Sequence, residues 1–442
     1  MTLDIVVGSG LVILAVILAL TVRGRVRERR RESAAREALA RTVETGAQPA
    51  SLHPDIDLGQ CIGSGACTEV CPEQDVLSVI DGKAHVVNPT ACIGHGECMR
   101  ACPVDAIQLV LGTARRGVDL PLVSRDYETK VPGIYVVGEL GGMGLIYNAM
   151  SQALQCLAAI ARDPPPREAG VHQVLVVGAG PAGIAATLAA MDAGLDVVTL
   201  EQESFGGTVM HYPRHKVVMT RPVTLPLYGP LRVTDVSKEE LLDRWQDLRD
   251  QTGLEVREGV TVKGVEPVPG GPFTVDTTAG VFRAQRVVLA LGRRGTPRKL
   301  GIPGEDLGKV TYRLLDPEQY AGARCLVVGG GNAGVEAAIS LGEAGAEVHL
   351  AHRRKVFDRL APKNQARLDE AVAADRVTLL LQASPTAIHP DRVEVEVDGE
   401  RQEVPNDYVL VFIGGVLPTK FLEAAGVEVH TFRGEAFAPA NA

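Results

Sequence analysis

Six of the eight cysteines in this 442-residue chain fall into two runs of the same spacing. Each run reads Cys-x5-Cys-x3-Cys-Pro; one extends from Cys61 to Cys71 and the other from Cys92 to Cys102. This is the iron–sulfur spacing C-x2-C-x2-C-x3-C-P with the second cysteine replaced. Short glycine-containing turns between the cysteines allow several thiolates to converge on one centre. The two runs therefore predict iron–sulfur clusters and the transfer of single electrons.

The replaced positions hold Ser64 in the first run and His95 in the second. A neutral imidazole is a competent iron ligand, so His95 is expected to bind a cluster iron or to contact the cluster edge. The alternative is a three-iron cluster that lacks this corner iron. Ser64 is expected not to bind, because its hydroxyl would first have to lose a proton of high pKa. The clusters are thus expected to be 4Fe-4S or 3Fe-4S.

A glycine-rich turn at Gly178–Gly183 lies between a strand-like apolar run and a helix-like run. Its sequence, GAGPAG, is the G-x-G-x-x-G fingerprint, whose glycines bring the backbone close to a pyrophosphate at a helix N-terminus. Glu201 ends the next strand-like run, where a carboxylate can accept a hydrogen bond from a ribose hydroxyl. These features in register predict a dinucleotide site. Its expected contacts are Gly178, Gly180, Pro181, Ala182, Gly183, Glu201, Gly206 and Gly207.

A second fingerprint, GGGNAG, occupies Gly329–Gly334. The strand-like run after it ends in basic residues instead of an acid. Guanidinium groups can pair with a 2′-phosphate, so NADPH is expected here in preference to NADH. A solvated basic turn is the alternative interpretation. The expected contacts are Gly329, Gly331, Asn332, Ala333, Gly334, His352, Arg353 and Arg354.

The two fingerprints, with LALGRRGTPRKLGIPG at 289–304 between them, resemble the thioredoxin-reductase-like class of two-dinucleotide flavoproteins. The resemblance covers roughly residues 171–425. It implies FAD in the first site, NADPH in the second and a crossover between domains near Gly292. Disulfide reductases of this class carry a Cys-x-x-Cys pair, which this sequence does not contain. Dithiol exchange through an internal pair is therefore not expected.

The same class ends in a PGIY-x-x-GD segment that contacts the flavin, and the sequence after Ile413 has no such segment. The stretch VPGIYVVGE at 131–139 matches it but precedes the first fingerprint. We therefore expect a circular permutation in which residues 113–163 fold back onto the FAD domain. Glu139 stands where the class has aspartate. The flavin contacts that the resemblance implies here are Gly138, Glu139, Gly141 and Gly142.

Residues 55–112 resemble bacterial two-cluster ferredoxins, in which the last cysteine of each run ligates the other cluster. Carried over to this sequence, the resemblance implies a first cluster held by Cys61, Cys67 and Cys102. It implies a second cluster held by Cys92, Cys98 and Cys71, with His95 as a further candidate ligand.

Residues 5–22 form an uncharged apolar run, and six arginines follow between Arg23 and Arg31. Length and charge predict one transmembrane helix in the inner membrane, with the catalytic domains in the cytoplasm. The alternative, a cleaved signal peptide, would need positive charge before the run and a small-residue cleavage site after it. The formal net charge of −9 gives no reason to expect a nucleic-acid partner.

The segment 211–230 is long, basic and interrupted by prolines. One interpretation is that its polar side chains line the flavin face, and the other is a basic surface loop. The side chains concerned are His211, Tyr212, Arg214, His215 and Lys216.

The expected fold is an α/β flavoprotein with two dinucleotide-binding domains, an α+β ferredoxin-like module and one N-terminal transmembrane helix. The expected parts are a transmembrane helix (1–22), a basic juxtamembrane helix and linker (23–54), the two-cluster module (55–112), the permuted FAD segment (113–163), the FAD-binding domain (171–296), the NAD(P)H-binding domain (297–403) and a return to the FAD domain (404–442).

The expected activity is that of a membrane-anchored, FAD-dependent NAD(P)H oxidoreductase similar to ferredoxin–NADP reductases. Flavin accepts a hydride and iron–sulfur clusters carry single electrons, so the set converts two-electron into one-electron transfer. The expected partner is a ferredoxin-like, haem or quinone electron carrier, and homodimer formation is left open. Two rival functions are a low-molecular-weight disulfide reductase of the bacillithiol type and a non-catalytic redox sensor.

Overall fold

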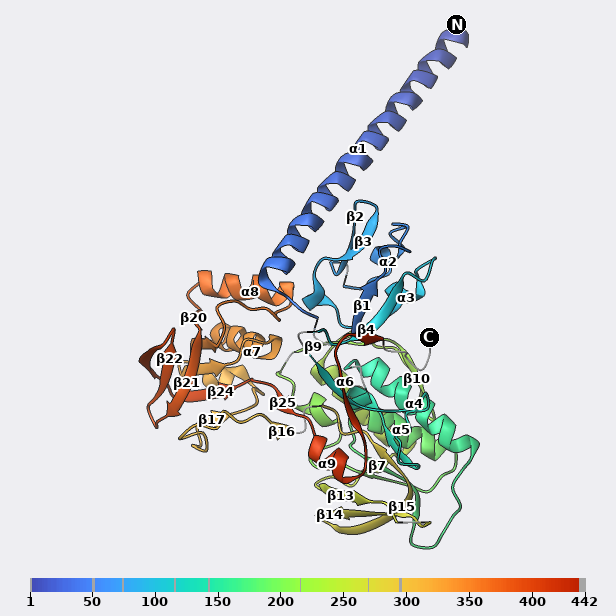
Figure 1. The fold of residues 1–442 in the computed structure, drawn as a ribbon, viewed down its shortest axis with the longest axis vertical. Helices are drawn as coiled ribbons and strands as arrows, with labels where there is room; N and C mark the ends of the chain where they lie inside the picture. Colours follow the sequence, from blue (N-terminus) through green and yellow to red (C-terminus); the bar gives the residue numbers. More distant parts are fainter. Residues whose placement is uncertain are drawn as a thin grey trace. The chain divides into compact units, whose positions relative to one another are not determined.

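The computed structural model describes residues 2–49, 52–73, 75–114, 117–141, 144–214, 216–268, 270–293 and 296–436 (Figure 1). Gly142 and His215, both named from the sequence, lie outside the described residues. The chain divides into two compact units, Met1–Val110 and Leu111–Ala442.

The first unit begins with helix α1, Thr2–Thr45. The C-terminal part of α1 packs on the cysteine module, where Ala35 and Ala38 are buried together with Ile80 and Val87. The Thr42 hydroxyl also donates a hydrogen bond to the Val87 carbonyl oxygen at 2.7 Å. The charged half of α1 is therefore a structural part of the cysteine module.

No helix within the described ranges has the length and apolar character needed to cross a bilayer. The predictions of a transmembrane helix at 5–22 and of an inner-membrane location are therefore wrong. The apolar run is instead the start of α1, which continues without a break through the arginines that follow.

The cysteine module contains two small sheets and two four-residue helices. Strands β2 and β3 form an antiparallel hairpin, and β1 pairs with β4. The short helices α2 and α3 each carry the middle cysteine of one run. The elements are β1 (Leu52–Ile56), α2 (Ala66–Glu69), β2 (Leu77–Ile80), β3 (Lys83–Val86), η1 (Pro89–Ala91), α3 (Glu97–Arg100) and β4 (Ile107–Leu111).

The second unit contains a six-stranded sheet that carries the first fingerprint. Its order is β13-β14-β15-β7-β8, and β6 pairs in parallel with β15 at Val287–Leu289. The strands are β6 (Ile134–Val136), β7 (His172–Val177), β8 (Val197–Leu200), β13 (Val262–Glu266), β14 (Phe273–Thr277) and β15 (Gly280–Leu289). Almost every residue of β6 and β7 is buried, which agrees with their unbroken apolar sequences.

Helices α4 (Ile146–Arg162) and α5 (Pro181–Asp192) lie side by side against this sheet (Figure 1). Helix α6 (Lys238–Thr252) contributes the fully buried Trp245 to the same core. The opposite face of the sheet is covered partly by α9 (Thr419–Ala424). Strand β5 (Val118–Pro121) pairs antiparallel with β26 (Val429–Phe432), so residues before the first fingerprint also meet the C-terminal part of this unit.

A second, all-parallel sheet in this unit carries the second fingerprint. Its order is β17-β24-β18-β19-β20, and β24 lies in the segment that the sequence assigned to the return into the FAD domain. Helices α7 (Asn332–Glu343) and α8 (Pro362–Ala373) pack on one face of this sheet. The strands are β17 (Val310–Thr311), β18 (Arg324–Val328), β19 (Glu347–His352), β20 (Val377–Leu381) and β24 (Tyr408–Val411).

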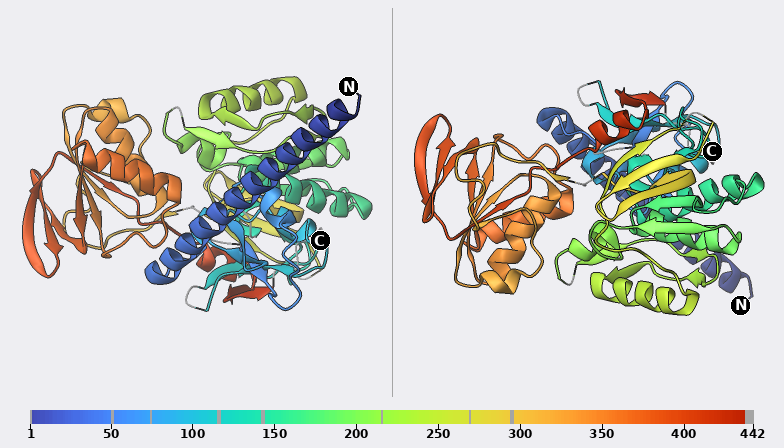
Figure 2. Two further views of the ribbon diagram at one scale, coloured as in Figure 1. Left: turned by 90° about the horizontal axis from the view of Figure 1, so that it is seen from above. Right: turned by 90° about the horizontal axis from the view of Figure 1, so that it is seen from below.

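An antiparallel sheet packs on the other face of this parallel sheet (Figure 2). Its strands are β21 (Ala383–Ile388), β22 (Arg392–Val397) and β23 (Glu400–Pro405). Two short strands, β16 (Thr296–Pro297) and β25 (Gly415–Val416), pair antiparallel where the chain enters and leaves this half of the unit.

The segment 211–230 is not a surface loop. After the short helix η3 (Gly207–His211), β9 (Val217–Met219) pairs with β12 (Asp235–Ser237), and β10 (Val223–Leu225) pairs with β11 (Gly229–Leu231). Val218, Val223 and Leu225 are buried in the same core as α4 and α5. These apolar positions anchor the segment in the core.

Candidate functional site

A cavity of about 380 Å³ lies beside the first fingerprint turn. Its walls come from segments far apart in the sequence, including both segments that were expected to hold flavin. The expected contacts that line it are Gly138, Glu139, Gly178, Gly180, Pro181, Ala182, Glu201, Gly207 and Gly292. An elongated nucleotide with polar and apolar parts suits such a cavity.

The fingerprint turn is closed on its inner side and open toward the cavity. Gly178 has a φ of 104°, and a Cβ there would lie 2.5 Å from the Ala290 carbonyl oxygen. A Cβ at Gly183 would lie 1.8 Å from the Gly178 carbonyl oxygen. A Cβ at Gly180 would meet no protein atom within 4 Å. The turn can therefore present bare backbone to a pyrophosphate at Gly180.

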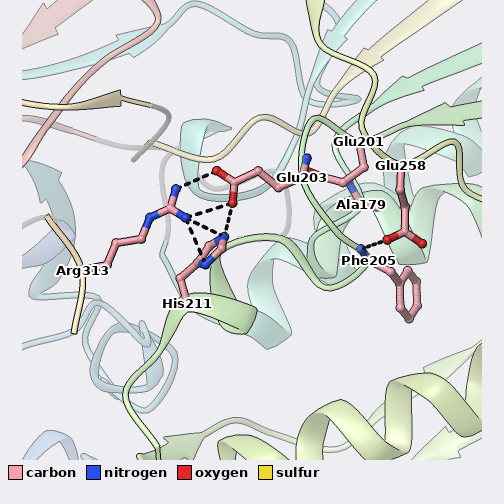
Figure 3. Close-up of polar contacts among 7 residues, drawn as sticks. All are labelled: Ala179, Glu201, Glu203, Phe205, His211, Glu258 and Arg313. Carbon is pink, nitrogen blue, oxygen red and sulfur yellow. Dashed lines mark hydrogen bonds and ion pairs between the residues drawn. The ribbon is translucent and has the colours of Figure 1, made fainter. Parts of the chain in front are cut away.

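Glu201 is buried at the end of β8 and holds the turn in place. Its Oε2 accepts a hydrogen bond from the Ala179 N–H at 2.7 Å, and its Oε1 accepts one from the Glu203 N–H at 2.9 Å (Figure 3). A carboxylate has about four acceptor positions, so it retains capacity for a ribose hydroxyl.

A charged cluster on the cavity wall joins the two halves of this unit. The Arg313 guanidinium donates to both carboxylate oxygens of Glu203, and His211 contacts the same carboxylate (Figure 3). Arg313, and then His211, holds the pKa of Glu203 below its ordinary value. The sequence reasoning missed Glu203 and Arg313, because Arg313 belongs to no motif and lies 110 positions from Glu203.

The segment expected to be permuted forms another wall of the cavity. Gly138 has a φ of 84° and donates its N–H to Gln152 Oε1 at 2.8 Å, which ties the turn η2 (Gly138–Gly141) to α4. Glu139 lies on the cavity wall. Burial lowers the pKa of Arg293, and the nearby negative charge of Glu139 partly opposes that shift.

Polar residues of segment 211–230 divide between two roles. His211 and Tyr212 line the cavity. Arg214 and Lys216 face the other half of the unit, where they pair with Asp316 at 3.6 Å and with Glu336 at 3.1 Å. The first pair of residues can thus act on a ligand, while the second pair joins the two halves.

The second fingerprint turn repeats the geometry of the first. Gly329 has a φ of 135°, and a Cβ there would lie 2.2 Å from the Phe412 carbonyl oxygen. A Cβ at Gly334 would lie 2.3 Å from the Gly329 carbonyl oxygen, whereas one at Gly331 would meet nothing within 4 Å. Asn332 Oδ1 accepts from the Ala361 N–H at 2.9 Å and so holds the start of α8. In this turn too, one glycine, Gly331, has backbone that a phosphate group could approach.

The three basic residues after β19 have different surroundings. His352 is buried, stacks on Phe357 with 4.6 Å between ring centroids, and has its pKa lowered by burial. Arg354 forms an ion pair with Asp358. Arg353 is exposed. Of the three expected contacts, Arg353 is therefore best placed to meet a 2′-phosphate. The His352 ring instead lies against Gly330 of the turn.

The cysteine loops of the first unit repeat one another in backbone conformation. Gly63 and Gly65 have φ values of 68° and 75°, and Gly94 and Gly96 both have 80°. A Cβ at Gly63 would lie 2.1 Å from the Gly82 carbonyl oxygen. Glycine is thus required there by both conformation and space.

Burial and neighbouring thiols raise the pKa of Cys67, Cys92 and Cys98 in the cysteine module. Burial raises the pKa of Cys67, and its thiol neighbours Cys61 and Cys102 raise it further. Burial also raises the pKa of Cys92 to about 11 and of Cys98 to about 12, and Cys71 adds to both shifts. Cys67, which belongs to the other expected ligand set, also contributes to the raised pKa of Cys98. Thiols so buried favour the neutral form until a positively charged centre binds them.

The thiols are spaced as separate ligands. Within the ranges that the structure describes, no three His, Cys, Asp or Glu side chains are grouped closely enough to hold one metal ion. A cubane cluster binds each thiolate through a different iron, so its ligands need not share one coordination sphere. Backbone N–H groups of Ala84 and Ala106 point to the sulfurs of Cys61 and Cys102, both at 3.3 Å. Such contacts tune cluster potentials. The donor set therefore fits clusters.

Residues 175–438 match the family model described as pyridine nucleotide-disulphide oxidoreductase. The chain belongs to this family. Residues 53–103 of this oxidoreductase match the model of a 4Fe-4S dicluster domain. The predictions of an FAD-dependent enzyme that uses NADP(H), of two dinucleotide-binding domains and of a ferredoxin-type domain are thereby confirmed.

This pyridine nucleotide-disulphide oxidoreductase is similar to the ferredoxin–NADP reductase of Ignicoccus hospitalis, at 28% identity over 59% of this chain and 83% of that protein. It is also similar to the bacilliredoxin reductase Bdr of Bacillus subtilis, at 24% identity over 60% of this chain and 84% of that protein. Among solved structures, the bacillithiol disulfide reductase Bdr (YpdA) of Staphylococcus aureus has the same fold, with a TM-score of 0.53, 24% identity, and coverage of 58% of this chain and 80% of that one.

Proposed function

We propose that the chain transfers electrons between NADPH and a one-electron acceptor through FAD and two iron–sulfur clusters. The observation that carries this proposal is the combination of a nucleotide cavity in one unit with two thiol groups at iron–sulfur spacing in the other. Bound FAD takes up two electrons as hydride and can release them singly. A ferredoxin-like protein is the acceptor that best matches this chemistry.

The FAD site is assigned to the cavity beside the first fingerprint. Gly180 offers backbone to the pyrophosphate, Glu201 offers a carboxylate to the ribose, and Glu139 offers a second carboxylate on the cavity wall. NADPH is assigned to the second fingerprint, where Gly331 is open and Arg353 is exposed.

A circular permutation is part of this proposal, with residues 113–163 as the segment that completes the FAD domain. The parallel pairing of β6 with β15 supports it, as does the packing of α4 against α5. So does the close approach of Gly138 to Ala182, since a Cβ at Gly138 would lie 3.0 Å from that methyl group.

The clusters are assigned to the two thiol groups. Cys61, Cys67 and Cys102 hold the first cluster, and Cys92, Cys98 and Cys71 hold the second. The doubled backbone conformation of the loops and the cavity that Cys71, Cys92 and Cys98 line together support this division.

Anaerobic reduction tests the proposal in both directions. NADPH is added to the full chain loaded with flavin and iron, and cluster reduction is followed by electron paramagnetic resonance. In the reverse arm, dithionite-reduced protein freed of excess reductant receives NADP⁺, and NADPH formation is followed by absorbance. We expect NADPH to reduce the clusters, or the reduced clusters to be oxidised as NADPH forms, in at least one of the two arms. Protein without flavin should show neither reaction. Loaded protein whose clusters exchange electrons with the nucleotide in neither arm would disprove the proposal.

Reduction of a low-molecular-weight disulfide is the second candidate, favoured by the side chains of His211 and Arg313 on the cavity wall. The two cysteines outside the module, Cys156 and Cys325, are fully buried in the core, which disfavours an internal dithiol relay. NADPH consumption with oxidised bacillithiol, compared with a one-electron dye, separates the two candidates. Faster turnover with the disulfide in a variant that binds no iron would favour the second.

A further inference from the structure

The two cysteine loops are the same backbone with one decisive difference in side chain. The loops read CIGSGAC and CIGHGEC, and the residues that bracket the replaced position are left-handed glycines in both. Ser64 and His95 therefore stand at matching places, each where the iron–sulfur spacing would have its second cysteine. Any difference between the two sites must come from the side chains and their surroundings.

The Ser64 hydroxyl is used within its own loop. The residue is exposed, and its Oγ accepts a hydrogen bond from the Ala66 N–H at 3.5 Å, within its own loop. A hydroxyl used in this way is engaged with the backbone of its own loop. The first thiol group thus has three sulfur donors and no fourth donor from the expected position.

His95 occupies the matching position in the second loop but is less exposed than Ser64. It is half-buried, and its neighbours Gly94 and Gly96 are buried. It lies on the wall of a small cavity that Cys71, Cys92 and Cys98 also line. One histidine and three cysteines of the module therefore line the same cavity.

The loop that carries His95 is held by its own helix. Arg100 in α3 donates to the His95 carbonyl oxygen at 3.3 Å and to Glu97 Oε1 at 2.7 Å. The corresponding position of the first run is Glu69, which has no guanidinium to offer. This brace fixes the backbone at His95.

We propose that His95 is the fourth protein ligand of the second cluster and that the first cluster has three thiolate ligands only. The proposal rests on the assignment of the six cysteines given above. The chain then carries one four-iron and one three-iron cluster, because an iron without a protein ligand is the one most easily lost. A neutral imidazole in place of a thiolate also raises the reduction potential of the second cluster, as histidine does in Rieske centres.

The experiment uses the full chain, reconstituted anaerobically with iron and sulfide and then oxidised mildly. Iron content and the three-iron resonance of the oxidised protein count the clusters. Pulsed resonance of the reduced protein detects nitrogen coupled to the four-iron cluster. We expect about one three-iron spin per chain and a nitrogen coupling in the unmodified protein.

Three variants test the two halves of the proposal separately. His95→Ala is expected to raise the three-iron signal roughly twofold and to abolish the nitrogen coupling. His95→Cys is expected to keep the four-iron cluster, lose the coupling and lower the potential of that cluster. Ser64→Cys is expected to convert the three-iron cluster to a four-iron one while the coupling stays.

Specific results overturn the inference. If His95→Ala retains the nitrogen coupling and the iron content of the unmodified chain, His95 is not a ligand. If the unmodified chain holds two four-iron clusters after oxidation, the three-ligand first site is wrong. A chain that takes up no iron contradicts the cluster assignment of the proposed function as well, and so is told apart from a failure of this inference alone.

Discussion

Glu203 accepts two hydrogen bonds from Arg313, one at 3.2 Å from Nη1 to Oε2 and one at 2.6 Å from Nη2 to Oε1. Glu203 follows β8 beside the first fingerprint, and Arg313 follows β17 in the other half of the unit. The pair therefore bridges the two nucleotide-binding halves beside the cavity that both residues line.

Arg313→Ala is expected to lower the free energy of unfolding by no more than ~1 kcal/mol, because both side chains are over a third exposed and water screens the pair. Arg313 lowers the pKa of Glu203, so the contribution exists above the ordinary pKa of 4.5 and is lost as pH falls through the folded value. Urea unfolding at neutral and acid pH measures this. Arg313→Lys keeps the positive charge but loses the two-point contact of the guanidinium group. Its free energy of unfolding should lie between those of the unmodified protein and Arg313→Ala. An equal decrease in the free energy of unfolding at neutral and acid pH would refute the stabilising role of the Arg313–Glu203 pair.

Gly180→Ala and Gly183→Ala form a matched pair in the first fingerprint. Gly180→Ala should fold normally, since its Cβ meets no protein atom, but should bind flavin about tenfold more weakly because the methyl group occupies the phosphate position. Gly183→Ala should unfold, since its Cβ would lie 1.8 Å from the Gly178 carbonyl oxygen. Circular dichroism and flavin absorbance measure the two effects. Normal flavin affinity in Gly180→Ala would contradict the site.

Arg353→Ala is expected to raise KM for NADPH by roughly 10- to 100-fold, the effect of losing a charge-assisted hydrogen bond, while KM for NADH changes little. Arg354→Ala is the control, because Arg354 is already paired with Asp358. Steady-state kinetics with a one-electron dye measures both. Equal effects on NADPH and NADH would show that Arg353 does not read the 2′-phosphate.

Asp407→Asn is expected to flatten the acid dependence of stability. Hydrogen bonds from the Arg324 side chain and backbone lower the pKa of Asp407 to about 2. Its contribution is therefore present above the ordinary pKa of 3.8 and is lost as pH falls toward 2. Urea midpoints of the two proteins should converge over that range. A constant difference between them down to pH 2 would contradict this.

The two fingerprint turns and the cysteine loops could be predicted from the sequence, because short-range backbone geometry determines much of their residue spacing. Gly183 and Gly334 are required by contacts within a single strand–turn–helix unit, so their spacing reports the turn, whereas Gly178 and Gly329 meet the carbonyl oxygens of Ala290 and Phe412, which follow distant strands. The doubled cysteine spacing is likewise local. Strand β6 was expected in the flavin domain from a resemblance, and its pairing with β15 is one that periodicity alone could not have indicated.

What the sequence could not provide depends on tertiary contacts. Nothing near Arg313 indicates that it will meet Glu203, and nothing near His352 indicates that it will lie under Gly330, where a Cβ would be 2.1 Å from its Nδ1. The transmembrane prediction for residues 5–22 used only the length of the apolar run and the arginines after it. It took no account of the helix that continues to Thr45.

The parallel pairing of β6 with β15 also fixes an order of events during synthesis. Ile134–Val136 leave the ribosome well before Val287–Leu289, the residues that complete their hydrogen bonds. The cysteine module can collapse early on local contacts, whereas the turn η2 and α4 must wait for a strand made much later. A nascent chain paused between these points would expose the apolar edge of β6, and chaperone binding should concentrate on that interval.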